Sequence, residues 1–244
     1  MTTVTPCPAL RPYISRFAIS PGGGMYRVLP DTELVMGFQY RGRLETGATT
    51  LATAGITGLL QEARTFTASA DARSILVYFK PGRAAPFFEQ PMHELHNQSL
   101  AIDELWAPAA VRSFEDRLLG AIDDTARIRL VESFLLERLR ERAPDPMVTE
   151  ALTLMAAAKG QLRVSALAEA LHTSASPLEK RFRREVGATP KQFASLLRFR
   201  EILKQRGSSL TAAAYEAGYF DQAHFIRDFK AFTGETPGAF FKAD

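Results

Sequence analysis

The sequence predicts an α+β protein in which a β-rich N-terminal part precedes a purely helical C-terminal part. Three observations lead to this prediction. Strand-like alternation fills residues 25–80, helical periodicity begins at Pro108, and a short pattern occurs twice near the C-terminal end. We expect a β-rich domain over residues 1–107, a helical connecting segment and linker over 108–147, and an all-α domain over 148–244.

The bulk composition is that of an ordinary globular protein. Of the 244 residues, 46% are hydrophobic and 23% charged, so neither a disordered nor a fibrous protein is expected. The single cysteine, Cys7, excludes a disulfide framework or a cysteine-based metal site within the chain and fits a reducing cytosol. No signal-peptide core and no run of about 18 apolar residues occurs. We therefore expect a cytoplasmic protein without a membrane partner.

Charge is distributed unevenly along the chain. Residues 1–150 hold 16 basic and 18 acidic side chains, a net charge of −2, whereas residues 151–244 hold 14 and 9, a net charge of +5. A basic C-terminal part indicates a polyanionic partner for that part alone.

Alternating apolar positions mark the expected strands. One face of ELVMGFQY collects large side chains: Leu34, Met36, Phe38 and Tyr40. ARSILVYFK alternates in the same way, with apolar residues on one face at Ile75, Val77 and Phe79. Short strands separated by turn residues favour an antiparallel barrel or sandwich.

The segment from Pro108 to residue 142 has helical periodicity. A first apolar stripe consists of Val111, Phe114, Leu118 and Leu119. A second consists of Ile128, Val131, Phe134, Leu135, Leu136 and Leu139. Residues 127–142 fit either a dimerisation helix or a solvated scaffold helix, and the pattern does not decide between them. The breaker-rich APDPM, residues 143–147, is expected to be a linker.

Two similar stretches lie 47 positions apart. FRREVGATPKQF, residues 182–193, and FKAFTGETPGAF, residues 229–240, share five of twelve residues. The identical pairs are Phe182/Phe229, Gly187/Gly234, Thr189/Thr236, Pro190/Pro237 and Phe193/Phe240. We expect the glycine to end one helix in a left-handed turn, the threonine to cap the next helix and the proline to occupy its first turn.

The helices around both copies have the order of a helix-turn-helix. In VSALAEALHTSASPLEKRFRREVG, residues Leu178, Phe182 and Val186 are expected to face inward, and cations lie on the outer side. In the second half, LTAAAYEAGY is expected to form a short helix and Asp221 to cap the next one. A helix of about 17 residues, roughly 25 Å long, joins the halves. A short helix with an exposed basic side is suited to the major groove.

The string AGYFDQAHFIRDFKAFTGETPGAFF, with LEKRFRREVGATPKQF upstream, resembles the DNA-binding domain of AraC/XylS-type transcriptional regulators. The resemblance covers roughly residues 149–242. It implies two helix-turn-helix units joined by one helix, whose recognition helices enter successive major grooves about 34 Å apart.

The resemblance also implies roles for individual residues. Base-facing positions are Ser176, Glu179 and Lys180 on the first recognition helix, and Gln222, Ala223, Ile226 and Arg227 on the second. Phosphate contacts are implied for Arg183, Arg184 and Lys230. Two positions depart from the family pattern: Ala223 replaces a more usual serine, and Lys180 replaces a commoner arginine, which removes bidentate guanine reading there.

The N-terminal part resembles the β-rich sensor segment that precedes such domains in one subset of these regulators. The resemblance rests on YRVLPDTELVMGF, YFKPGRAAPFF and PMHELHNQSLAIDELW. It implies a cupin-like barrel or sandwich that binds a small-molecule effector or mediates dimerisation, and the fold does not fix the ligand.

The remaining reactive side chains favour structural roles. His93 and His96 are spaced i, i+3 but lack a third histidine nearby, so we expect a surface or turn role rather than a metal site. His224 lies within the D-Q-x-H-F string, where packing or an internal hydrogen bond is expected. Some alkyl-transfer repair regulators fuse a reactive-cysteine domain to this DNA-binding module, but they need several cysteines. No catalytic residue, metal or cofactor is expected.

Two functional hypotheses follow from the sequence. The first is a sequence-specific DNA-binding transcriptional regulator, modulated by a small molecule or by dimerisation. The alternative is a cupin-like enzyme or carrier whose C-terminal helices only scaffold. The duplicated basic helix-turn-helix favours the regulator, and no G-x-S-x-G, H-E-x-x-H or P-loop motif supports an enzyme. The expected partner is double-stranded DNA, with a small-molecule effector, a second copy and RNA polymerase as candidates.

Overall fold

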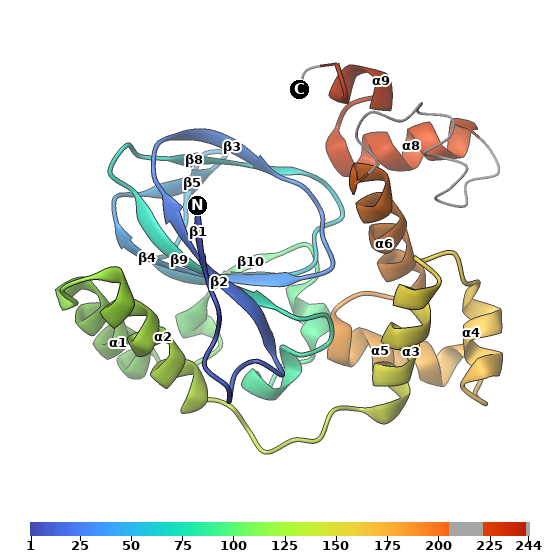
Figure 1. The fold of residues 1–244 in the computed structure, drawn as a ribbon, viewed down its shortest axis with the longest axis horizontal. Coiled ribbons are helices and arrows are strands. Elements are labelled where there is room, and N and C mark those ends of the chain that lie inside the picture. Colours follow the sequence, from blue (N-terminus) through green and yellow to red (C-terminus); the bar gives the residue numbers. More distant parts are fainter. Residues whose placement is uncertain (205–221, 243–244) are drawn as a thin grey trace.

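The computed structural model describes residues 1–204 and 222–242 (Figure 1). Antiparallel sheets form the N-terminal part, and helices form the C-terminal part. The predicted α+β fold class is confirmed. No helix among the described residues is long and apolar enough to cross a membrane.

The N-terminal part contains two antiparallel sheets. The larger has the order β1-β2-β9-β4-β7-β10, from β1 (Thr2–Val4), β2 (Ile14–Pro21), β9 (Arg73–Phe79), β4 (Leu34–Arg41), β7 (Ala54–Thr57) and β10 (Ser99–Ala101). The smaller has the order β3-β8-β5-β6, from β3 (Gly24–Val28), β8 (Arg64–Ala68), β5 (Leu44–Thr46) and β6 (Thr49–Thr50). This two-sheet arrangement agrees with the predicted barrel or sandwich.

The predicted alternation in β4 and β9 is confirmed. One face of the pair is fully buried, with Leu34, Met36 and Phe38 facing the same side as Ile75, Val77 and Phe79. Met36 lies opposite Val77 in the ladder, so the buried side chains of neighbouring strands pack in register.

Strands extend beyond the predicted range of residues 25–80. β1 and β2 precede it, β10 follows it, and β2 lies between β1 and β9 in the larger sheet. The pairing of β2 with β9 shifts register between Ile14 and Arg16. This irregularity breaks the two-residue alternation of buried positions, which explains why the β2 pattern is hard to read from the sequence.

Helices α1 (Pro108–Gly120) and α2 (Asp124–Leu136) pack on one another and on the larger sheet. The ring of Phe38 in β4 lies 5.1 Å from that of Phe114 and 6.1 Å from that of Phe134. The apolar stripe of α2 thus packs against the sheet, which favours the scaffold interpretation of residues 127–142. Two predicted stripe residues instead face solvent, Leu119 at 59% and Leu136 at 39% exposure.

The 3-10 helices η1 (Ala85–Phe87) and η2 (Met92–Leu95) lie between β9 and β10, and η3 (Ile102–Glu104) connects β10 to α1. The C-terminal helices are α3 (Pro146–Ala157), α4 (Val164–Ala170), α5 (Ala175–Val186), α6 (Pro190–Lys204), α8 (Gln222–Thr233) and α9 (Pro237–Phe240). α3 begins inside the predicted 143–147 linker, because Asp145 caps it by accepting the Val148 N–H at 3.2 Å.

Candidate nucleic-acid interface

Helix α5 has one buried and one exposed side. Leu178, Phe182 and Val186 are 0% exposed, as predicted. Every residue expected to face DNA on this helix is exposed: Ser176, Glu179, Lys180, Arg183 and Arg184. The apolar side fixes the helix on the protein and leaves the polar side to solvent.

The cations of α5 are not equivalent. Arg181 donates to both carboxylate oxygens of Asp145, at 2.6 and 2.7 Å, and so fastens α5 to the start of α3. Among the described residues, Lys180, Arg183 and Arg184 have no carboxylate within the 4.0 Å ion-pair distance. These three cations can therefore meet an external anion without breaking an internal pair.

Asp145 is held in its ionised form by this contact. Burial raises the pKa of Asp145, but the Arg181 side chain and the Val148 amide outweigh that effect and lower the pKa below its usual value. Arg142 pairs with Glu185 near the end of the same helix, and Glu185 is only 6% exposed. Both pairings were missed by the sequence reasoning, because they join residues 36 and 43 positions apart.

Helix α8 repeats the two-sided arrangement of α5. Phe225, Phe229 and Phe232 are buried, as predicted, and the Phe199 ring of α6 lies 5.6 Å from Phe229 and 4.9 Å from Phe232. The exposed side carries Ala223, Ile226, Arg227 and Lys230. The side chains of Gln222 and His224, the predicted Asp221 cap and the predicted helix in LTAAAYEAGY lie outside the described part of the chain.

The exposed residues of the two helices follow the same spacing. Ser176, Glu179, Lys180 and Arg183 stand at i, i+3, i+4 and i+7. Adding the repeat offset of 47 gives the second set: Ala223, Ile226, Arg227 and Lys230. Positions with this spacing share one face of a helix, so each helix presents a single comparable stripe.

The turns after the two helices share a glycine but differ at the cap. Gly187 and Gly234 have φ values of +96° and +74°, which confirms the predicted left-handed turns. Thr189 forms a capping box, because its hydroxyl accepts the Gln192 N–H at 3.1 Å and its N–H donates to Gln192 Oε1 at 2.8 Å. Thr236 occupies the cap position without a side-chain hydrogen bond, so the predicted side-chain cap is wrong there. The Ala239 N–H bonds to its backbone carbonyl instead.

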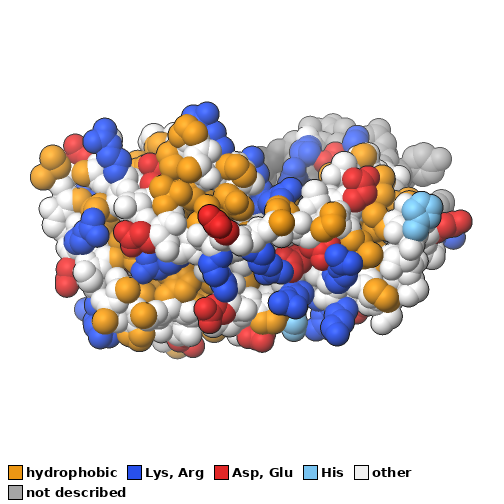
Figure 2. Space-filling model, turned by 90° about the horizontal axis from the view of Figure 1, so that it is seen from below, with side chains coloured by type: hydrophobic (Ala, Val, Ile, Leu, Met, Phe, Trp, Pro, Cys, Tyr) orange, Lys and Arg blue, Asp and Glu red, His pale blue; other side chains and the backbone are white. Residues whose placement is uncertain are grey.

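Figure 2 shows the side of the molecule that lies at the bottom of Figure 1. Lys and Arg side chains gather on it in several groups, with acidic side chains between them. Positive charge is therefore concentrated in patches rather than spread as a uniform basic surface.

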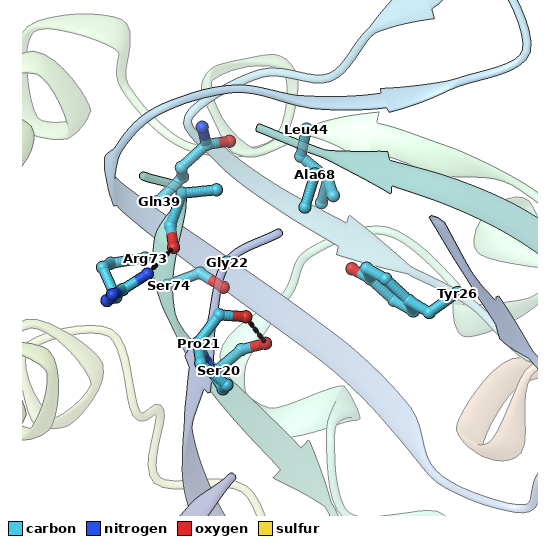
Figure 3. A pocket seen from close by; sticks show the side chains of 10 residues that line it. Ser20, Pro21, Gly22, Tyr26, Gln39, Leu44, Ala68, Arg73 and Ser74 are labelled. Atoms are coloured by element: carbon cyan, nitrogen blue, oxygen red, sulfur yellow. Dashed lines mark hydrogen bonds between the residues drawn. The ribbon is translucent and has the colours of Figure 1, made fainter. Parts of the chain in front are cut away.

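A second candidate site is a small pocket between the two sheets (Figure 3). Tyr26, Leu44 and Ala68 of the smaller sheet line one side, and Gln39 and Arg73 of the larger sheet lie across from them. The pocket is partly open to solvent and has a volume of about 20 Å³, enough for roughly one water molecule. A larger ligand would therefore require the sheets to separate.

Tyr26 lines this pocket, and its hydroxyl group interacts electrostatically with that of Tyr78. Burial raises the pKa of both Tyr26 and Tyr78, and each stays protonated at neutral pH. The Arg16 guanidinium lies 3.6 Å from the Tyr78 ring centroid and pairs with Glu33 at 2.7 Å. A ligand bound in the pocket would meet the hydroxyl group of Tyr26, whereas Tyr78 and Arg16 lie further along their strands and do not line it.

The other reactive side chains lie in structural surroundings. His93 lies in η2 and His96 ends it, where its ring contacts Gln192 of α6. The Cys7 N–H donates to Glu132 of α2 at 2.6 Å, which holds the N-terminal segment on that helix. Within residues 1–204 and 222–242, no group of three His, Cys, Asp or Glu residues could hold a metal ion.

Comparisons with known proteins agree with this geometry. Residues 167–243 match a family described as a helix-turn-helix domain, and residues 2–101 match one described as a domain of unknown function (DUF6597). No curated protein matches the chain.

Solved structures of ToxT from Vibrio cholerae are similar over most of the chain. One at 1.65 Å resolution has a TM-score of 0.50 and 11% identity, covering 93% of this chain and 98% of that chain. Another, from strain O395 and bound to (E)-4-(8-methylnaphthalen-1-yl)but-3-enoic acid, has a TM-score of 0.49 and 11% identity over the same shares. At such identities the likeness concerns the fold. The helix-turn-helix domain at residues 167–243 and the fold, a β-sheet domain followed by helices, agree with the resemblance to AraC/XylS-type transcriptional regulators.

Proposed function

We propose that the protein is an AraC/XylS-type transcriptional regulator that reads double-stranded DNA with two helices, α5 and α8, laid in successive major grooves. Base edges are read by Ser176, Glu179 and Lys180 from α5, and by Gln222, Ala223, Ile226 and Arg227 from α8. Phosphates are contacted by Arg183, Arg184 and Lys230. The three parts are residues 1–107, 108–147 and 148–244, of which the last binds DNA.

One observation carries this proposal. On α5, the cation that serves the fold, Arg181, is paired with Asp145, whereas Lys180, Arg183 and Arg184 lie on the exposed side with no carboxylate of the described residues in ion-pair range. Unpaired cations on one exposed helix face are suited to the phosphate-lined groove of DNA. Binding is favourable there because cations that neutralise phosphates release the counterions bound to the DNA. The enzyme or carrier alternative does not explain why these cations are exposed and unpaired on one face of α5.

Binding titrations can separate base reading from phosphate contact. Sites are first recovered by genome-wide mapping of bound DNA. Lys180→Ala should then cost about 1–3 kcal/mol on a recovered site and relax the preference at one base pair. Arg184→Ala should weaken recovered and scrambled DNA alike and reduce the salt slope by about one. Equal losses on both DNAs for Lys180→Ala would contradict its base-reading role.

The sheet domain is proposed to bind the modulating small molecule between its two sheets, at the pocket lined by Tyr26. Compounds are screened for a change in the operator affinity of the full-length chain. Their effect should be lost in Tyr26→Ala, which removes a ring at the pocket, and kept in Met25→Ala. Met25 is the matched control, because it lies next along β3 and is 76% exposed. An effect that survives Tyr26→Ala would place the effector elsewhere.

The proposal extends to partners and location. A second copy could pack on the exposed apolar residues of the α1–α2 hairpin, Leu119, Ile122 and Leu136. Sedimentation of the full-length chain tests this, since Ile122→Asp should lower its mass if that face dimerises. RNA polymerase is a further proposed partner. The protein is proposed to act in the cytoplasm, where the DNA is, and to have no catalytic role.

A further inference from the structure

The segment around η2 reaches from the sheet domain to the turn between α5 and α6. Met92 and Leu95 are buried at 0% and 1% exposure. A Cβ atom on Gly187 would lie only 3.0 Å from the carbonyl oxygen of Met92. The backbone of the sheet domain thus passes so close to the end of α5 that it leaves little room for any side chain there.

His96 ends η2 and contacts this turn directly. Its Nε2 atom lies 3.3 Å from Nε2 of Gln192. Gln192 is oriented by its other amide atom, since Oε1 accepts the Thr189 N–H at 2.8 Å. The Gln192 NH2 group is therefore the donor and His96 Nε2 the acceptor, which requires a neutral imidazole with its proton on Nδ1.

The surroundings of His96 favour this neutral form. Burial lowers the pKa of His96, and although the backbone of Gly187 opposes this, the charge of Arg183 acts in the lowering direction. The neutral form agrees with the acceptor role of Nε2, although its proton then lies on a buried Nδ1 that has no hydrogen-bond partner among the described residues.

The other side of His96 is anchored in the sheet domain. The next residue, Asn97, donates its N–H to the Leu59 carbonyl at 3.0 Å and accepts from Arg64 at 3.1 Å. Arg64 lies in β8 of the smaller sheet and also donates to the Ser99 hydroxyl at 2.7 Å. Hydrogen bonds on both sides of His96 therefore connect the smaller sheet to the α5–α6 turn.

We propose that His96 is a positioning residue of the first recognition helix. His96 accepts a hydrogen bond from the Gln192 side chain and so keeps Gln192 in the capping box with Thr189. Because this capping box follows directly on α5, the contact fixes the orientation of α5 relative to the sheet domain. This rests on the proposed function, because α5 is taken to face DNA. We call the hydrogen bond between His96 and Gln192 the bridge. The second unit has no such bridge at the matching position, since Ala239 stands where the repeat has Gln192.

Amide hydrogen exchange of the full-length chain tests the bridge without DNA. His96→Leu removes the acceptor, whereas His96→Gln can place Oε1 near the position of Nε2. We expect His96→Leu to speed exchange at the Thr189 amide by about threefold to tenfold, the effect of one lost hydrogen bond. His96→Gln should keep the wild-type rate. His93→Leu, one turn earlier in the same 3-10 segment, is the matched control and should leave Thr189 unchanged.

DNA binding of the same variants tests the consequence. On a site recovered from the genome, His96→Leu should lose about threefold to tenfold in affinity. Its discrimination between bases should weaken only in the half read by α5. Because His96 acts through Gln192, the double variant His96→Leu/Gln192→Ala should bind no more weakly than Gln192→Ala alone.

These experiments separate the positioning role of His96 from the proposed DNA-binding function. The proposal is wrong if the Thr189 amide of His96→Leu exchanges at the wild-type rate. It is also wrong if this amide exchanges as fast in His96→Gln as in His96→Leu. An equal loss of base discrimination in both DNA halves would contradict it as well. If Thr189 exchange changes as expected but Lys180→Ala leaves discrimination intact, the DNA-facing role of α5 fails while the bridge stands. Should His96→Leu not fold, His96→Asn, whose shorter side chain cannot reach Gln192, carries the test with the same readouts.

Discussion

Helices α5 and α8, which are proposed to read DNA, are built alike but supported differently. α5 shares a continuous apolar core with the sheet domain, and η2, Arg142 and Asp145 all contact it. α8 packs on α6 and α9 through an aromatic cluster that includes Phe199 and Phe229, and the ion pair of Arg27 with Glu235 connects its end to β3. Buried residues of both helices belong to one apolar core, but α5 packs directly on η1 and η2, whereas the end of α8 is linked to β3 by an ion pair of partly exposed side chains. The same repeat can therefore respond differently to changes in the sheet domain.

Removing a central aromatic ring from each unit should reveal the largest difference between α5 and α8. Phe182→Ala and Phe229→Ala each delete a side chain that is at most 1% exposed, at a cost of about 3–5 kcal/mol. Phe182→Ala should loosen α5 and the adjoining sheet together, whereas Phe229→Ala should loosen mainly α8 and α9. Hydrogen exchange of β9 and α8 in both variants measures this. Matching exchange patterns in the two variants would mean that the units are equally coupled to the sheet.

The turn glycines give the next largest difference. Both have positive φ, so alanine costs about 1–2 kcal/mol at either position. At Gly187 the new Cβ also meets the Met92 carbonyl at 3.0 Å, whereas at Gly234 it meets only the flexible end of Arg27. We expect Gly187→Ala to lower the free energy of unfolding by about 1 kcal/mol more than Gly234→Ala. Urea denaturation measures the two values, and equal losses would argue against a tight contact at Gly187.

Asp145 allows the support of α5 to be weakened by pH. Its folded pKa is depressed, so its contribution is complete above the unfolded pKa of about 3.9 and is lost as the pH falls through the lower folded value. Asp145→Asn keeps a good cap but removes the charge that pairs with Arg181. It should cost less than about 1 kcal/mol at pH 7, because Arg181 is 43% exposed. The difference from wild type should shrink steadily as the pH falls below the unfolded pKa of about 3.9, and a difference that does not change with pH in acid would rule out the charge as its origin.

The smallest effect is expected at the contact of the second unit with the sheet domain. The side chains of Arg27 and Glu235 are 35% and 43% exposed, so their ion pair is worth about 0–1 kcal/mol and is screened by salt. Arg27→Glu should lower stability slightly at low salt, and Arg27→Glu/Glu235→Arg should restore it. A large loss in Arg27→Glu that the double variant does not restore would show that Arg27 supports the fold in another way.

Local patterns were sufficient to predict much of this molecule. The alternation of Leu34, Met36 and Phe38 predicts β4, and Gly187 and Gly234 predict left-handed turns, because these features depend on nearby residues alone. The strand β2 escapes prediction because its register shift disturbs the alternation. The pairing of His96 with Gln192 joins residues 96 positions apart, and only the packing of η2 on α5 brings them together.

The central claim is that the two copies of one helix-turn-helix read two different DNA segments. It is tested most directly by measuring the affinity of wild type, Lys180→Ala and Arg227→Ala for a recovered site in which every base pair is substituted in turn. We predict that each variant loses discrimination in one segment only, and that the two segments lie about one helical turn, 10–10.5 base pairs, apart. Loss of discrimination in the same segment by both variants, or in neither segment, would contradict this account.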